Sequence, residues 1–151
     1  MKIGVFPGSF DPFTKGHEDV VRQALLLFDE VVIGIGVNES KTYLFDLQKR
    51  IAHIERIFEN LPVQVEAYNC LTVEFAKQKG AQFLIRGLRD SRDFSYERAI
   101  AHTNDQISGI KSVFLLTRQE FGSINATIVR ELYKNKGDIS PFVTRPEMLV
   151  M

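Results

Sequence analysis

Residues 8–17 read GSFDPFTKGH and separate an apolar run from an amphipathic stretch. The run at residues 3–6 has the length of a short buried strand, which we expect to end at Pro7 and Gly8. Residues 18–28 carry apolar side chains at helical spacing, so a helix is expected to begin near His17. The loop between them would lie at the carboxyl end of a parallel strand. Backbone N–H groups and a helix N-terminus bind anions at such a position.

The same alternation of short apolar runs and longer helical patterns continues along the chain. The expected strands are 3–6, 31–37, 63–67, 83–85 and 112–116, and the expected helices are 18–28, 46–61, 71–79, 93–108 and 125–134. Repeated strand and helix units predict an α/β fold, a Rossmann-like doubly wound sheet of about five parallel strands with helices on both faces. We expect a single domain over residues 1–151, with 138–151 as a short C-terminal tail.

Composition narrows the class of protein. A chain of 151 residues with 44% apolar and 25% charged residues is typical of a globular protein. Nineteen basic residues balance nineteen acidic ones, so the positive field that attracts nucleic acid is absent and no nucleic acid partner is expected. The single cysteine, Cys70, is expected to be a partly buried thiol in a reducing compartment. Because we find no pattern of a membrane span or secretory leader, we expect a cytoplasmic protein with no membrane partner.

Several basic residues follow predicted strands, at the edge where open parallel sheets bind ligands. Arg86 and Arg89 flank Gly87 directly after the fourth strand, and two guanidiniums at that position suit two phosphates. Lys41 follows the second strand, and the turn at residues 121–125 follows the fifth. For each cation the alternative is a solvated surface side chain. Together with residues 8–17, these segments predict a site for one polyanionic substrate.

His17 is the strongest candidate for a catalytic group. As a hydrogen-bond donor it would stabilise charge that grows on a phosphoryl group, and the alternative is a structural histidine. Glu97 would accept from a ribose hydroxyl or favour the helix dipole, whereas His53 and His102 are expected to pack or face solvent. No group of His, Cys and carboxylates has metal-ligand spacing, so no metal held by protein side chains is expected. The sequence also lacks GxxxxGK[ST] and GxGxxG, which sets aside P-loop and dinucleotide-binding proteins.

Three stretches in order, GSFDPFTKGH, RGLRDSRDFSYE and FGSINATIVRE, resemble the bacterial phosphopantetheine adenylyltransferases of the nucleotidyltransferase superfamily. The resemblance runs from about residue 2 to residue 137. The superfamily usually has an HxGH motif, and Thr14 replaces its first histidine here, as in this family. The resemblance implies transfer of AMP from ATP to 4′-phosphopantetheine, giving dephospho-coenzyme A and pyrophosphate in the penultimate step of coenzyme A biosynthesis. The attacking group is already a phosphate, so no general base is required.

The resemblance also implies roles for individual residues. His17 would stabilise the transition state at the α-phosphate with help from Ser9 and Lys41. Phosphopantetheine would contact Ser9, Lys41, Thr72 and Arg86. ATP would contact Ser9, Phe10, His17, Gly87, Leu88, Arg89, Glu97, Phe121, Gly122, Ser123, Ile124, Asn125, Ala126 and Thr127. Mg²⁺ would bridge the phosphates and be held more by ATP than by side chains. Family members form homohexamers, so the same assembly is implied.

The chain departs from the family at two places. Asn125 and Ala126 stand where many relatives have serines, which leaves the Thr127 hydroxyl and backbone N–H groups to contact phosphate. At Thr72 the family is often apolar, so the backbone there would matter more than the side chain. Two alternatives stay open: a nucleotidyltransferase acting on glycerol phosphate or nicotinamide mononucleotide, and a non-catalytic nucleotide-binding module. Thr14 and the RGLR block argue against the first. The second is disfavoured by the presence together of Ser9, His17, Lys41, Arg86 and Arg89.

Overall fold

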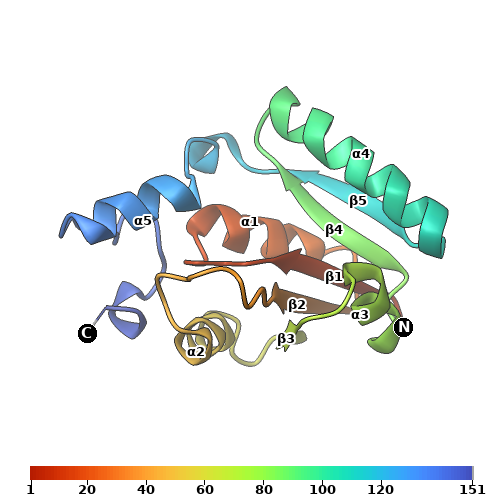
Figure 1. Ribbon diagram of the computed structural model, residues 1–151, viewed down its shortest axis with the longest axis horizontal. Helices are drawn as coiled ribbons and strands as arrows, with labels where there is room; N and C mark the ends of the chain where they lie inside the picture. The colour runs from red at the N-terminus through yellow and green to blue at the C-terminus, as the bar shows by residue number, and fades with distance from the viewer. Residues whose placement is uncertain (151) are drawn as a thin grey trace.

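A five-stranded sheet forms the centre of the computed structural model, which describes residues 1–150 (Figure 1). Its strands are β1 (Ile3–Gly8), β2 (Glu30–Gly36), β3 (Val63–Tyr68), β4 (Phe83–Leu88) and β5 (Lys111–Leu116). They lie in the order β3-β2-β1-β4-β5, and every neighbouring pair is parallel. The predicted parallel, Rossmann-like sheet is confirmed.

Helices cover both faces of the sheet. They are α1 (Lys15–Ala24), α2 (Leu47–Ile57), α3 (Thr72–Gln78), α4 (Ser91–Ser108) and α5 (Ala126–Lys134), with short 3₁₀ helices η1 (Gln119–Phe121) and η2 (Pro146–Met148). On one face, Val21 of α1 and Ile54 of α2 pack with Ile33 of β2. On the other face, Phe75 of α3 packs with Val32 and Leu84. The predicted doubly wound arrangement is therefore confirmed, and its core lies between these layers.

The strand order explains why a ligand site forms at one edge. The chain turns from β1 to β2 and β3 on one side and returns to β4 and β5 on the other, so the order reverses between β1 and β4. These two strands pair only at Gly4 with Phe83 and at Val5 with Leu84. Beyond that point their carboxyl ends are not joined by pairing, and ligands bind in the crevice of a parallel sheet at such a reversal.

In the first unit the end of β1 agrees with the prediction, and the end of α1 does not. β1 runs through Pro7 to Gly8, with Pro7 opposite Gly34 of β2 and past the segment paired with β4. The absent N–H of Pro7 therefore costs no bond to β4. α1 ends at Ala24 rather than at residue 28. Leu26, which extended the apolar pattern, lies in the following turn with 86% of its surface exposed.

The predicted C-terminal segment packs against the domain. Ile139, Val143 and Leu149 form a small apolar cluster with Val129 of α5 and with Phe45. Figure 1 shows α5 and the C-terminus together at the left of the molecule, beside α1 and α2. Within residues 1–150, no helix is both long enough and apolar enough to cross a membrane.

Candidate active site

A cavity of about 480 Å³ opens where β1 and β4 end. Its lining comes from the end of β1 with the loop that follows and the first turns of α1, from the end of β4 with the start of α4, from Thr117 after β5, and from the N-terminus of α5. We call residues 9–14 the β1 loop and residues 89–90 the β4 loop. The cavity is lined by these predicted site residues: Ser9, Phe10, His17, Arg86, Gly87, Arg89, Glu97, Ile124, Asn125, Ala126 and Thr127.

Six predicted site residues do not line this cavity: Lys41, Thr72, Leu88, Phe121, Gly122 and Ser123. Lys41 lies in an exposed segment between β2 and α2. Thr72 begins α3, where its hydroxyl shares a 2.9 Å hydrogen bond with that of Tyr68. Leu88 is buried, and its carbonyl accepts from the Thr117 backbone N–H at 2.8 Å. The proposed substrate contacts of all six stay predictions.

Thr14 fixes His17 at the start of α1. Thr14 is the N-cap of the helix, and its hydroxyl accepts from the His17 backbone N–H at 3.4 Å. In return, the Thr14 backbone N–H donates to His17 Nδ1 at 3.0 Å. This is a capping box in which a histidine takes the place of the usual glutamate or glutamine. The imidazole is therefore oriented by the backbone of the loop that precedes it.

The environment of His17 makes its ring neutral. The ring centroid lies 5.0 Å from that of Phe10, 5.4 Å from Phe13 and 6.3 Å from Phe6. Removal from water in this aromatic setting, together with the positive charge of Arg89, lowers the His17 pKa to about 4. Because Nδ1 accepts from the Thr14 N–H, the single proton of the neutral ring lies on Nε2. His17 can therefore act toward the cavity as a neutral hydrogen-bond donor.

Arg86 pairs with Glu97 across the cavity wall. Arg86 Nε of β4 lies 3.3 Å from Glu97 Oε2 of α4, and both side chains are largely buried. These two buried atoms have no hydrogen-bond partner in the part of the chain described, so the pair is electrostatic rather than hydrogen-bonded. The sequence predicted phosphate contact for the arginine and nucleotide contact for the carboxylate. In the structure the two are neighbours, so a ligand that binds one acts on the other.

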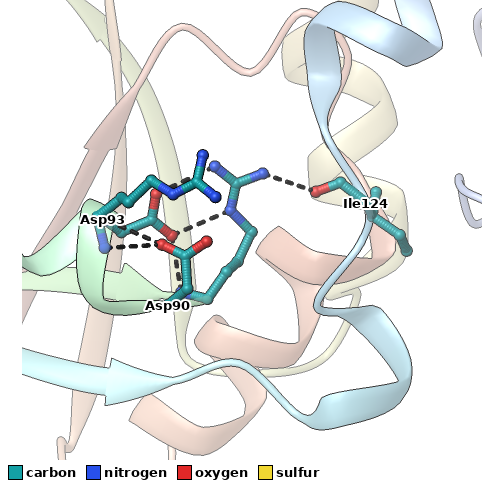
Figure 2. Close-up of polar contacts among 5 residues, drawn as sticks. Asp90, Asp93 and Ile124 are labelled. Carbon is teal, nitrogen blue, oxygen red and sulfur yellow. Dashed lines mark hydrogen bonds and ion pairs between the residues drawn. The ribbon is translucent and has the colours of Figure 1, made fainter.

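Arg89 is held by a carboxylate in the first turn of α4. Its Nε donates to Asp93 Oδ2 and its Nη2 to Oδ1, each at 3.1 Å, which is a two-point contact. Its Nη1 donates to the Ile124 carbonyl at 3.2 Å, which joins the β4 loop to the segment before α5. Figure 2 shows these polar contacts, with Asp90, Asp93 and Ile124 labelled. The bonds to Asp93 raise the pKa of Arg89 and lower that of Asp93.

The β4 loop also sets the start of α4. Asp90 is the N-cap, and its carboxylate accepts from the backbone N–H groups of Arg92 and Asp93 at 3.0 and 3.1 Å. For this reason the helix begins at Ser91, two residues before the predicted start. Gly87 has a packing role as well, because an added Cβ would lie 2.6 Å from Val20 Cγ2 of α1. Glycine at this position lets β4 approach α1 closely.

At the N-terminus of α5, a side chain already accepts hydrogen bonds from two backbone N–H groups. Asn125 is the N-cap, and its Oδ1 accepts from Thr127 N–H at 2.7 Å and from Ile128 N–H at 3.4 Å. The Thr127 hydroxyl accepts from Arg130 Nη2 at 3.0 Å. A phosphate that contacts these two backbone N–H groups would have to displace the Asn125 side chain.

The structure adds lining residues that sequence reasoning left out, among them Gly16, Val20, Asp93 and Thr117. Asp93 had a signal, since a carboxylate four residues after Arg89 at a helix start suits an ion pair. Val20 belongs to the apolar stripe of α1, and nothing in its spacing separates cavity lining from core. Among residues 1–150, no group of three or more His, Cys, Asp or Glu side chains has the arrangement of a metal site.

Fold and site together define an enzyme of the nucleotidyltransferase type. A family model described as cytidylyltransferase-like matches residues 5–132. The chain is 50% identical over 144 residues to a phosphopantetheine adenylyltransferase of Phocaeicola vulgatus, covering 95% of each, and 46% identical over 146 residues to that of Bacteroides fragilis, covering 96% of this chain and 97% of the relative. The chain belongs to the phosphopantetheine adenylyltransferase family.

One solved structure illustrates how far the fold extends beyond that family. A bifunctional NMN adenylyltransferase/ADP ribose pyrophosphatase from Francisella tularensis superposes with a TM-score of 0.72 at 19% identity. The match covers 94% of this chain and 44% of that one. At this identity the likeness concerns the fold alone, so the acceptor specificity has to come from the closer relatives and from the site.

Proposed function

We propose a division of roles within this cavity for the reaction of the family, the transfer of AMP from ATP to 4′-phosphopantetheine. The chain catalyses this transfer, which yields dephospho-coenzyme A and pyrophosphate in coenzyme A biosynthesis. A phosphate oxygen of 4′-phosphopantetheine attacks the α-phosphorus of ATP. The bond between that phosphorus and the oxygen bridging to the β-phosphate breaks, and pyrophosphate leaves with the electron pair.

The observation that carries the mechanism is the state of His17. Its Nδ1 is occupied by the Thr14 N–H and its pKa is low, so the ring is unsuited to remove a proton at neutral pH. No base is needed, because the second pKa of a phosphate monoester is about 6 and the attacking group is already ionised. The Nε2–H instead donates to the oxygens of the α-phosphate as their charge grows. Catalysis then consists of alignment and of stabilising charge.

The β4 side of the cavity supplies the positive charge. Arg89 is fixed by Asp93 and has further N–H groups that would donate to the ATP phosphates. Arg86, beside Glu97, has N–H groups that would donate to the phosphate of the acceptor. Glu97 would contact the nucleotide. Lys41 and Thr72 complete the acceptor side in this proposal, which rests for them on the family resemblance. Ser9 and the N-terminus of α5 complete the nucleotide side.

Mg²⁺ enters this proposal with ATP. The cavity carboxylates Asp93 and Glu97 each have an arginine partner, and the described residues hold no metal-site cluster, which suits an ion held by phosphate oxygens. The ion would neutralise phosphate charge when bound. No step is assigned to a metal held by protein side chains.

We also infer a homohexamer and a cytoplasmic location. The support for assembly is α4, none of whose residues is buried in the isolated chain. Tyr96 and Ile107 of this helix and Leu116 of β5 are exposed by 71%, 57% and 71%, and contact between copies would cover them. Light scattering on the purified protein should give six times the mass of one chain, and a monomer would remove this inference. The support for a cytoplasmic location is the substrate pair, ATP and 4′-phosphopantetheine.

A coupled assay tests the reaction. Purified protein with ATP, Mg²⁺ and 4′-phosphopantetheine should release pyrophosphate, and a rate no higher than that of a blank without protein would overturn the proposal. Glycerol phosphate and nicotinamide mononucleotide, offered separately, should give no release. Release with either in preference to 4′-phosphopantetheine would assign a different acceptor to the same fold.

A further inference from the structure

Two buried charged side chains are not part of the cavity lining but bond to the loops near it. Asp11 of the β1 loop is 4% exposed, and Arg50 of α2 is 3% exposed. Taking a charge out of water is unfavourable unless hydrogen bonds compensate for the lost hydration. The bonds that these two side chains make therefore indicate what their burial achieves.

Asp11 joins the β1 loop to the segment between β2 and α2. We call residues 37–46 the β2 loop; it carries Lys41. Asp11 Oδ2 accepts from the Leu44 backbone N–H at 2.7 Å, and Oδ1 accepts from the Phe45 backbone N–H at 2.9 Å. Both carboxylate oxygens are thus used to hold one end of the β2 loop.

Arg50 makes the reciprocal connection. Its Nη1 donates to the Ser9 carbonyl at 2.7 Å, and its Nε donates to the Phe45 carbonyl at 2.9 Å. One guanidinium thereby bonds to the backbone of the β1 loop and of the β2 loop. A planar group with several fixed N–H directions suits this role, which a lysine ammonium cannot reproduce at both carbonyls.

The connection extends to the part of the β2 loop that contains Lys41. The Arg50 guanidinium carbon lies 4.4 Å from the centroid of the Tyr43 ring. The Tyr43 hydroxyl accepts from the Asn38 backbone N–H at 3.2 Å and donates to the Gly36 carbonyl at 3.5 Å. Tyr43 therefore closes residues 36–43 into a compact loop and attaches it to Arg50.

We propose that Asp11 and Arg50 are positioning residues that fix the β1 loop, with Ser9, relative to the β2 loop, with Lys41. This inference rests on the proposed function, in which Ser9 contacts the nucleotide and Lys41 contacts the acceptor. The two side chains touch neither substrate. They set the separation and orientation of the loops that do.

Such positioning matters because this reaction depends on alignment. When two bound phosphates react directly, an error of about 1 Å in their placement lowers the rate by about a hundredfold. Phe10, next to Ser9, adopts a positive φ of 48°, a left-handed conformation that is unfavourable for a bulky residue. Such a conformation persists only where the surroundings fix it, and the bonds of Asp11 and Arg50 hold the backbone on both sides of Phe10.

Asp11→Asn and Arg50→Lys test the inference. In Asp11→Asn, the side-chain NH₂ faces one of the two backbone N–H groups that donate to Asp11, so that hydrogen bond is lost. In Arg50→Lys, the positive charge is kept, but the ammonium cannot bond to both the Ser9 and Phe45 carbonyls. Each variant should lower kcat per folded molecule by about ten- to a hundredfold, while the KM values for ATP and 4′-phosphopantetheine change less than about threefold. Pyrophosphate release and circular dichroism supply the rate and the folded fraction.

Two further variants separate positioning from folding. Ile54→Ala removes a fully buried side chain one turn after Arg50, in the apolar cluster of α2, so it should lower Tm and leave kcat per folded molecule unchanged. Tyr43→Phe removes only the hydroxyl bonds to Asn38 and Gly36 and is expected to fold. It should lower kcat by a smaller factor than Arg50→Lys does.

The combination of Asp11→Asn with Arg50→Lys completes the test. If both residues act through the same connection, the double variant should lose less than the product of the two single losses. The inference is overturned if the foldable variants keep kcat within about twofold of the unaltered chain, or if Ile54→Ala loses as much. In that case the unaltered chain still releases pyrophosphate, whereas failure of the proposed function would appear as no release from the unaltered chain.

Discussion

The β1 loop and the β4 loop face the same cavity, yet the hydrogen-bond donors that they hold, His17 and Arg89, differ in charge. The β1 loop is buried and aromatic, and it fixes a neutral imidazole, His17, through a backbone N–H. The β4 loop is exposed, and it fixes a cation, Arg89, through the carboxylate of Asp93. Each loop ends in a helix N-cap, Thr14 in one and Asp90 in the other.

This difference indicates a separation of tasks. A neutral donor in a site shielded from water interacts weakly with a substrate and more strongly as charge grows in the transition state. A guanidinium attracts phosphates in both the ground state and the transition state, so it contributes to substrate binding more than to turnover. Changes in the β1 loop should therefore affect turnover, and changes in the β4 loop should affect affinity.

The largest effect is expected at His17. His17→Ala removes the main donor assigned to the transition state, so kcat should fall by roughly two to three orders of magnitude with a much smaller loss of ATP binding. The measurements are the rate of pyrophosphate release and calorimetric titration with ATP. His102→Ala, on the exposed side of α4, serves as the matched control and should keep full turnover. If His17→Ala turned over at nearly the normal rate, His17 would have a structural role only.

The next effect concerns Arg89. Because a hydrogen bond to a charged partner contributes about 1.5–3 kcal/mol, Arg89→Ala should raise the KM for ATP by about ten- to a hundredfold and change kcat less. Saturation curves for ATP at a fixed acceptor concentration measure the change. Arg118→Ala removes an arginine that is paired with Glu120 on the surface and does not line the cavity, so its KM should be normal. An unchanged KM for Arg89→Ala would remove Arg89 from the nucleotide site and end the proposed contrast.

Much of the fold was available from the sequence, because each strand and helix has a local pattern of its own. The repeated strand and helix units predicted that the strands are parallel, and the basic residues after the strands predicted which edge of the sheet holds the cavity. The pairings that fix those residues were not available. Asp11 meets Leu44 and Arg50 meets Ser9 across 33 and 41 residues of chain, and only the folded sheet brings them together.

The state of His17 illustrates the same limit. Its place near a helix start was predictable from the glycine before it and the apolar stripe after it. Its neutral form depends on three phenylalanine rings and on the charge of Arg89, which lies in the β4 loop. Sequence spacing therefore identified the residue, and the environment that sets its chemistry came from tertiary packing.

A smaller effect should appear in stability. His17 has a pKa of about 4 in the folded chain against 6.5 as its ordinary value, so between these pH values the unfolded chain binds more protons. Stability should therefore fall as pH decreases from 6.5 to 4, with a contribution from His17 of at most about 1.4 kcal/mol per pH unit. Urea unfolding across this range should give a shallower pH dependence for His17→Gln. His53, whose pKa is lowered by burial, and Asp93, whose pKa is lowered by its bonds to Arg89, contribute to the pH dependence of both proteins.

Equal slopes for the two proteins would mean that His17 titrates alike in the folded and unfolded chains. The neutral donor would then be lost as the feature that separates the β1 loop from the β4 loop.

The most direct test of the neutral donor is nitrogen NMR of the histidine rings in ¹⁵N-labelled protein, with His17→Gln used to assign the signals. At pH 7 the His17 ring should be neutral with its proton on Nε2, and titration should give a pKa near 4. A pKa near 6.5, or a neutral ring with its proton on Nδ1, would contradict the bond from Thr14 and the role derived from it.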